Sequence, residues 1–111
     1  MCYRAAVKIL RSYRKRGIVT VKDIIRTWAP PAENNTEAYV KSLLSIMSPR
    51  FAEPFVVTAD TEIDLRNREL VFHLLYAMTR IETGWNAAAM ATVKEKIYTG
   101  YDLAVTEPRF F

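Results

Sequence analysis

Carboxyl groups close to tryptophans are the first side chains in this sequence that could do chemistry. Glu33 and Glu37 follow Trp28, and Glu82 precedes Trp85. A carboxyl group held in an apolar pocket has a raised pKa and can act as a general acid on a glycosidic bond, usually opposite a second carboxylate. None of these glutamates is accompanied by a second carboxylate in a pattern that is diagnostic of a glycosidase. We therefore expect each to be structural, assign no catalytic residue, and favour a protein that is not an enzyme.

Residues 28–39 combine a proline turn with a cluster of polar side chains. Pro30 and Pro31 each fix φ and disfavour helix in the residue before them, so a helix that enters this segment must end there. Asn34 and Glu37 have the spacing of a capping box for the next helix. Capping explains much of this polarity, and the alternative is that some of these groups face a ligand in a shallow groove. The ligand-binding candidates are Trp28, Glu33, Asn34, Asn35 and Tyr39.

A second candidate site is a cluster of cations near the N-terminus, with the Tyr13 ring among them. Its members are Lys8, Arg11, Arg14, Lys15 and Arg16. They could contact the phosphates of an anionic polymer, or they could form a solvated face that also complements the negative end of a helix dipole. The two-helix unit around Gly17 is only loosely like a helix-turn-helix, because Pro30 interrupts its second helix. Weak, non-specific nucleic-acid binding is therefore the alternative function.

The net charge of +4 is unevenly distributed along the chain. Residues 1–50 contain ten Lys or Arg against three acidic residues, a net charge of +7, whereas residues 51–111 contain six against nine, a net charge of −3. Such a split lets one face attract an anionic polymer, or lets the two halves of the chain, or two copies of it, attract each other. The oligomeric state stays open.

Other classes of site lack the residues that they need. Cys2 is the only cysteine, so the sequence offers neither an internal disulfide nor a cysteine metal cluster. His73 lies among Phe72 and Leu74 on an expected core helix, where we expect a packed or partly exposed histidine. No catalytic triad, metalloprotease or phosphate-loop pattern can be assembled. We therefore expect no metal and no cofactor.

Apolar residues recur every three or four positions in the first half of the chain, which is typical of amphipathic helices. The pattern predicts a first helix over residues 3–16, with Gly17 as its left-handed cap. Thr20 caps a short second helix, and a third helix runs from Thr36 to about Ser48.

The second half begins with an extended connector, residues 55–58, which is at most one short strand without a partner. The helical pattern returns at Asp64 and continues to Gly84, and this segment should be the central core helix. A last helix is expected over residues 87–99, ended by Gly100.

These elements predict an all-α fold, a single compact bundle of four to five helices spanning residues 1–111. A chain of 111 residues, half of them hydrophobic, has room for one core. No apolar stretch approaches the roughly 18 residues that cross a membrane, and no apolar signal core opens the chain. We therefore expect neither a membrane span nor export by a signal peptide.

Three segments, residues 8–13, 19–28 and the Trp-Ala-Pro-Pro turn that follows, give the chain a resemblance to a known family. Over roughly residues 3–47 it resembles phage virion-associated and prophage proteins described as lysozyme-like or peptidoglycan-processing. The resemblance implies that residues 1–48 and 64–99 form the helical half of a lysozyme-like fold.

The same resemblance implies a partner and a location. The partner would be cell-wall glycan or other virion proteins, and the protein would stay in the host cytoplasm until virion assembly or lysis. An enzyme of this family would be a glycoside hydrolase or a lytic transglycosylase. Members usually carry an upstream segment rich in Arg, Asn, Pro and Gly, whereas this chain begins at Met1 almost directly on its first helix. We therefore expect it to lack the full catalytic apparatus.

Overall fold

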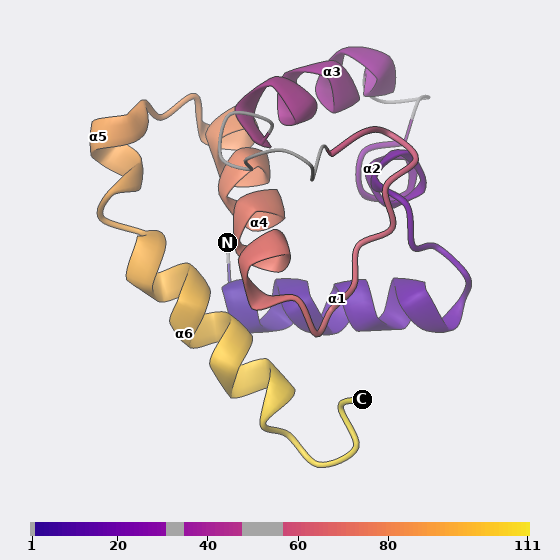
Figure 1. The fold of residues 1–111 in the computed structure, drawn as a ribbon. Helices are drawn as coiled ribbons and strands as arrows, with labels where there is room; N and C mark the ends of the chain where they lie inside the picture. The colour runs from indigo at the N-terminus through magenta and orange to yellow at the C-terminus, as the bar shows by residue number, and fades with distance from the viewer. Residues whose placement is uncertain (1, 31–34, 48–56) are drawn as a thin grey trace.

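The computed structural model describes residues 2–30, 35–47 and 57–111. These residues form six helices, labelled in Figure 1: α1 (Tyr3–Lys15), α2 (Val21–Trp28), α3 (Thr36–Met47), α4 (Arg68–Thr83), α5 (Ala87–Met90) and α6 (Lys94–Val105). Within the described ranges there is no sheet, and the one β contact is an isolated antiparallel bridge between Thr20 and Glu62. The predicted all-α fold is confirmed. None of the described helices is long and apolar enough to cross a membrane.

Helix α4 is the centre of the core, as its apolar pattern predicts. Nine consecutive or nearly consecutive residues from Leu70 to Thr79 are buried, so this helix is covered on almost every side. In Figure 1 it rises from α1, with α3 lying across its far end and α6 running down beside it. Asn67 caps its first turn by accepting a hydrogen bond from the Leu70 amide at 3.1 Å, and Gly84 ends it with φ of 72°.

Helix α1 buries one stripe of its surface, formed by Tyr3, Ala6, Val7 and Leu10. Its closest neighbour is α6, which crosses it at Gly100. A Cβ atom at residue 100 would lie 2.6 Å from the Tyr3 Cβ and 2.8 Å from the Arg4 amide nitrogen. The two backbones can therefore approach this closely only because residue 100 has no side chain.

This crossing corrects the prediction that Gly100 ends a helix. Residue 100 is buried inside α6, which continues to Val105. The predicted helix over residues 87–99 is instead divided, because α5 ends at Met90 and a turn separates it from α6. Glycine is both a helix stop and a residue of close packing, and the local pattern could not distinguish the two.

The start of the core helix also differs from its prediction. The helix begins at Arg68 and not at Asp64, because the Asp64 carboxylate accepts a hydrogen bond from the Arg66 amide at 2.9 Å and holds a turn. The preceding connector pairs with the loop before α2, where the Ile63 amide donates to the Val19 carbonyl at 2.8 Å. Of the predicted extended segment 55–58, residues 55 and 56 lie outside the described residues, and Val57 and Thr58 are not in a strand.

The caps of the first three helices are close to their predictions. Gly17 has the left-handed φ of 79°, and the Thr20 hydroxyl accepts a hydrogen bond from the Asp23 amide at 3.3 Å. The cap of α3 is Asn35, whose side-chain oxygen accepts from the Ala38 amide at 3.1 Å. The capping box predicted from Asn34 and Glu37 falls partly on Asn34, which lies outside the described residues, and the cap observed at Asn35 is a single hydrogen bond without a reciprocal one, since Ala38 has no polar side chain.

Candidate functional site

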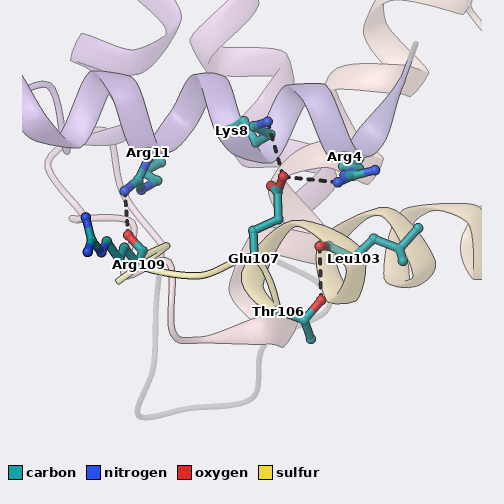
Figure 2. A network of polar contacts seen from close by, with 7 residues as sticks. All are labelled: Arg4, Lys8, Arg11, Leu103, Thr106, Glu107 and Arg109. Atoms are coloured by element: carbon teal, nitrogen blue, oxygen red, sulfur yellow. Dashed lines mark hydrogen bonds and ion pairs between the residues drawn. The ribbon is translucent and has the colours of Figure 1, made fainter.

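The chain after α6 folds back along α1 and occupies part of the predicted basic cluster. Figure 2 shows Glu107 between Arg4 and Lys8, with its Oε1 atom 3.0 Å from the Arg4 guanidinium and 3.4 Å from the Lys8 ammonium. The hydrogen bond from Arg4 lowers the pKa of Glu107, and the Lys8 charge acts in the same direction. These pairs join the basic first half of the chain to its acidic second half, as the charge split allows.

Arg11 is also held by the returning chain, but by neutral groups. Its Nη2 atom donates to the Arg109 carbonyl at 2.6 Å and its Nε atom to the Phe110 carbonyl at 2.5 Å. Its guanidinium carbon lies 5.4 Å from the centre of the Phe110 ring. A carbonyl or a ring leaves the positive charge of Arg11 uncancelled, unlike the carboxylate that faces Lys8.

The remaining cations border a hollow that we call the cationic cavity, with a volume of about 240 Å³. Its lining residues are Arg11, Arg14, Lys15, Leu65, Arg66, Phe110 and Phe111. None of the described lining residues is acidic. Arg66, which the sequence did not single out, has its guanidinium carbon 4.6 Å from the centre of the Phe111 ring. Arg16, the last member of the predicted cluster, is exposed beyond the end of α1.

The predicted groove residues lie in two different places. Trp28 and Tyr39 lie near the C-terminal end of α4, where the Trp28 indole donates to the Glu82 carboxylate at 3.1 Å. Burial raises the pKa of Tyr39, and the negative charge of Glu82 raises it further. Glu33 and Asn34 lie outside the described residues.

Asn35 lines a separate hollow of about 460 Å³, the Asn35 cavity. Its described lining residues are Lys22, Arg26, Asn35, Thr36, Glu37, Val40 and Ala59. Lys22 is paired with Asp60 at 2.8 Å, and Asn35 is occupied in capping α3. Lys22 and Asn35 therefore have partners within the protein, and the Thr36 hydroxyl donates to the Ala29 carbonyl at 2.7 Å.

The third glutamate candidate, Glu82, lines a cavity of about 280 Å³ that we call the Trp85 cavity. Its lining residues are Tyr3, Thr79, Glu82, Thr83, Trp85, Val93 and Lys96. They come from α1, α4, the loop after α4, the turn before α6 and α6 itself, so the packing of three helices assembles this site. Trp85 is 44% exposed, so a large part of its side chain is open to solvent.

The polar groups of the Trp85 cavity are held in place by hydrogen bonds within the protein. Tyr3 and Thr79 are joined by their hydroxyls at 3.0 Å, while the Thr79 hydroxyl donates to the Leu75 carbonyl at 2.8 Å. Because Thr79 has one hydroxyl proton, the Tyr3 hydroxyl is the donor in their shared bond. The Thr83 hydroxyl likewise donates to the Thr79 carbonyl at 2.7 Å and accepts from the Trp85 amide at 3.1 Å.

Sequence reasoning found Glu82 and Trp85 as neighbours but missed the other polar members of the Trp85 cavity. Thr79 and Thr83 are four residues apart, with Glu82 between them, so one face at the end of α4 is polar. That local pattern could have been read from the sequence. Tyr3 and Lys96 carry no such signal, because only the crossing of α1 and α6 brings them to this place.

The described lining of the Trp85 cavity contains one carboxylate, Glu82. Hydrolysis of a glycosidic bond by the usual pair of carboxylates requires a second one across the bond. Across the described part of the chain, no group of three or more His, Cys, Asp or Glu residues could hold a metal ion. The groups that this lining offers beyond its internal hydrogen bonds are the exposed Trp85 ring, one carboxylate and the Lys96 ammonium.

No family model, curated protein or solved structure matches this chain. The resemblance to lysozyme-like virion proteins therefore stays a prediction.

Proposed function

We propose that this chain is a glycan-binding module that holds one sugar residue of a cell-wall polymer in the Trp85 cavity. The observation that carries the proposal is that the exposed Trp85 side chain and Glu82 line the same cavity. A sugar ring has an apolar face of C–H groups that packs on an indole, and hydroxyls around its edge that need hydrogen-bond partners. The cavity offers both kinds of contact.

Hydrogen bonds to the backbone of Trp85 support the proposal. Arg80 donates to the Trp85 carbonyl at 3.2 Å, and the Thr83 hydroxyl accepts from the Trp85 amide at 3.1 Å. Gly84 turns the chain between them with φ of 72°. The Trp85 backbone is thus hydrogen-bonded at both its amide and its carbonyl, which limits the positions that its exposed ring can take for stacking on a ligand.

Two charged groups favour an amino sugar of peptidoglycan over a neutral glucose polymer. The Glu82 carboxylate, which already accepts from the Trp28 indole, has further lone pairs for the N–H of an acetamido group. Lys96, which also lines the cavity, suits the carboxylate of a lactyl or peptide substituent. A volume of about 280 Å³ suits one residue of a polymer chain.

The proposed activity is binding without cleavage, because the described cavity lining contains a single carboxylate. That the module serves in a phage virion, as the resemblance implies, is part of the same proposal. Its partners would then be the host cell wall and other virion proteins.

Co-sedimentation with purified peptidoglycan, and titration with a soluble muropeptide, test the proposal. We expect Trp85→Ala to weaken binding about tenfold, since an exposed stacking surface is lost without loss of core packing. Glu82→Gln keeps the shape and removes the charge, and should weaken binding less. Phe111→Ala is the matched control, because Phe111 is another exposed aromatic residue but lines the cationic cavity.

Two outcomes would overturn the proposal. One is peptidoglycan binding that Trp85→Ala leaves unchanged. The other is clearing of a cell-wall suspension by the wild-type protein that Glu82→Gln abolishes, which would make Glu82 catalytic and the protein an enzyme.

A further inference from the structure

We propose that the cationic cavity is a second and independent site, which binds single-stranded nucleic acid. The cavity lies at the C-terminal end of α1, whereas the Trp85 cavity includes Tyr3 at the first turn of the same helix. The eleven helical steps from Tyr3 to Arg14 span about 17 Å. The two sites can therefore be altered separately.

The charge of the cavity is the first support. Arg11, Arg14, Lys15 and Arg66 all line it, and within the described part of the chain no carboxylate pairs with the side chains of these four residues. The nearby Asp64 carboxylate accepts from the Arg66 backbone amide and does not pair with its guanidinium. Four uncancelled cations around about 240 Å³ make a strong local attraction for phosphates.

The geometry of two arginines is the second support. Arg11 and Arg66 lie against the faces of Phe110 and Phe111, at 5.4 Å and 4.6 Å from the ring centres. A guanidinium stacked on a ring keeps its charge and is held in one orientation. The hydrogen bonds from Arg11 to the backbone of residues 109 and 110 fix the wall of the cavity further.

An exposed aromatic ring favours a single strand over a duplex. Phe111 lines the cavity and is 57% exposed, so an unpaired base can stack on the part of the ring that Arg66 and Phe110 leave uncovered. Proteins that bind single strands combine a cationic groove with such stacking rings, and they show little sequence preference. A duplex keeps its base faces inside the stack and offers this ring only its backbone.

Fluorescence anisotropy with a labelled thymidine oligonucleotide of about 12 residues tests the proposal, at salt concentrations from about 50 to about 200 mM. The variant Lys15→Ala/Arg66→Ala should weaken binding about tenfold at low salt and reduce the logarithmic salt slope by about 1.4, the value for two lost phosphate contacts. Phe111→Ala should weaken binding about fivefold or more. All three side chains are exposed, so the fold should be retained, and circular dichroism checks this.

The matched control is Lys41→Ala/Lys94→Ala, which removes the same charge from exposed positions away from the cavity. We expect a much smaller loss of affinity from it. Equal losses in the two double variants would overturn the proposal, because binding would then follow net charge alone. So would inorganic polyphosphate or duplex DNA binding as tightly as the oligonucleotide, or an oligonucleotide affinity that Phe111→Ala leaves unchanged.

Discussion

The two ends of α1 carry similar charges but meet different neighbours. At the N-terminal end, α6 crosses the helix at Gly100, and Glu107 accepts from both Arg4 and Lys8. At the C-terminal end, the cover consists of backbone carbonyls and the rings of two phenylalanines. A carboxylate neutralises the positive charge of the side chain that it faces. Carbonyls and aromatic rings hold a guanidinium in one orientation and leave its charge in place. One basic stretch of sequence thus becomes an internal ion-pair network at one end and an open cationic cavity at the other.

The helix crossing at Gly100 should be the most sensitive point of this comparison. Gly100→Ala places a Cβ 2.6 Å from the Tyr3 Cβ and 2.8 Å from the Arg4 amide nitrogen, and backbone atoms cannot easily move aside. We expect the free energy of unfolding to fall by about 2 kcal/mol, although alanine favours a helix interior by about 1 kcal/mol. Urea denaturation measures it.

The sign of the change in the free energy of unfolding of Gly100→Ala decides whether the crossing is tightly packed. If the crossing were loose, alanine would stabilise the protein through helix propensity alone. Thr99→Ala, at the exposed neighbouring position, is the control and should change the free energy of unfolding by less than about 0.5 kcal/mol.

The buried hydrogen bond at the same end should give a smaller effect. Tyr3→Phe removes the donor to the Thr79 hydroxyl at 3.0 Å and keeps the packed ring. We expect a loss of about 1 kcal/mol in the free energy of unfolding, also measured in urea. Tyr13→Phe, a half-buried tyrosine on the same helix, should change little. Equal effects in the two variants would mean that the Tyr3 bond contributes nothing of its own.

The ion pairs of Glu107 should give the smallest effect and a characteristic pH dependence. The folded pKa of Glu107 is lowered, chiefly by the hydrogen bond from Arg4. Its contribution to stability is therefore fully present above the unfolded pKa of about 4.3 and is lost as the pH falls through the folded value. Glu107→Gln should be slightly less stable than the wild type at neutral pH and equally stable in strong acid.

Denaturation of both proteins at about pH 7 and about pH 3 checks this dependence. Added salt should reduce the difference at neutral pH, because the pairs are exposed. Glu95→Gln, an exposed glutamate on α6, is the control. A difference that persists unchanged at low pH would show that the Glu107 charge is not its cause.

Local sequence patterns predicted the helices correctly where a residue type has a single structural role. Thr20 and Gly84 cap their helices as predicted, and the apolar repeat around Leu74 lies in the core. The predictions were wrong where a residue type has two uses. Gly100 was predicted to end a helix, but it permits the close crossing of α6 and α1. Asp64 was predicted to begin a helix, but its carboxylate holds a turn.

The candidate sites were predictable only in part, for the same reason. The cations near the C-terminal end of α1 and the pair Glu82 and Trp85 are visible as neighbours in the sequence. Arg66 and Phe111 join the cations, and Tyr3 and Lys96 join the tryptophan, across long stretches of chain. No spacing rule connects them.

The sequence by itself determined the all-α class, the caps at Gly17, Thr20 and Gly84, the apolar stripes and the excess of positive charge in the first half, because each depends on residues within a few turns of one another. The tertiary structure alone decided which cations meet a carboxylate, where α6 crosses α1, and which polar groups share a cavity with Trp85. Those outcomes depend on contacts between residues as far apart as Arg4 and Glu107, which only the packing of the helices brings within reach.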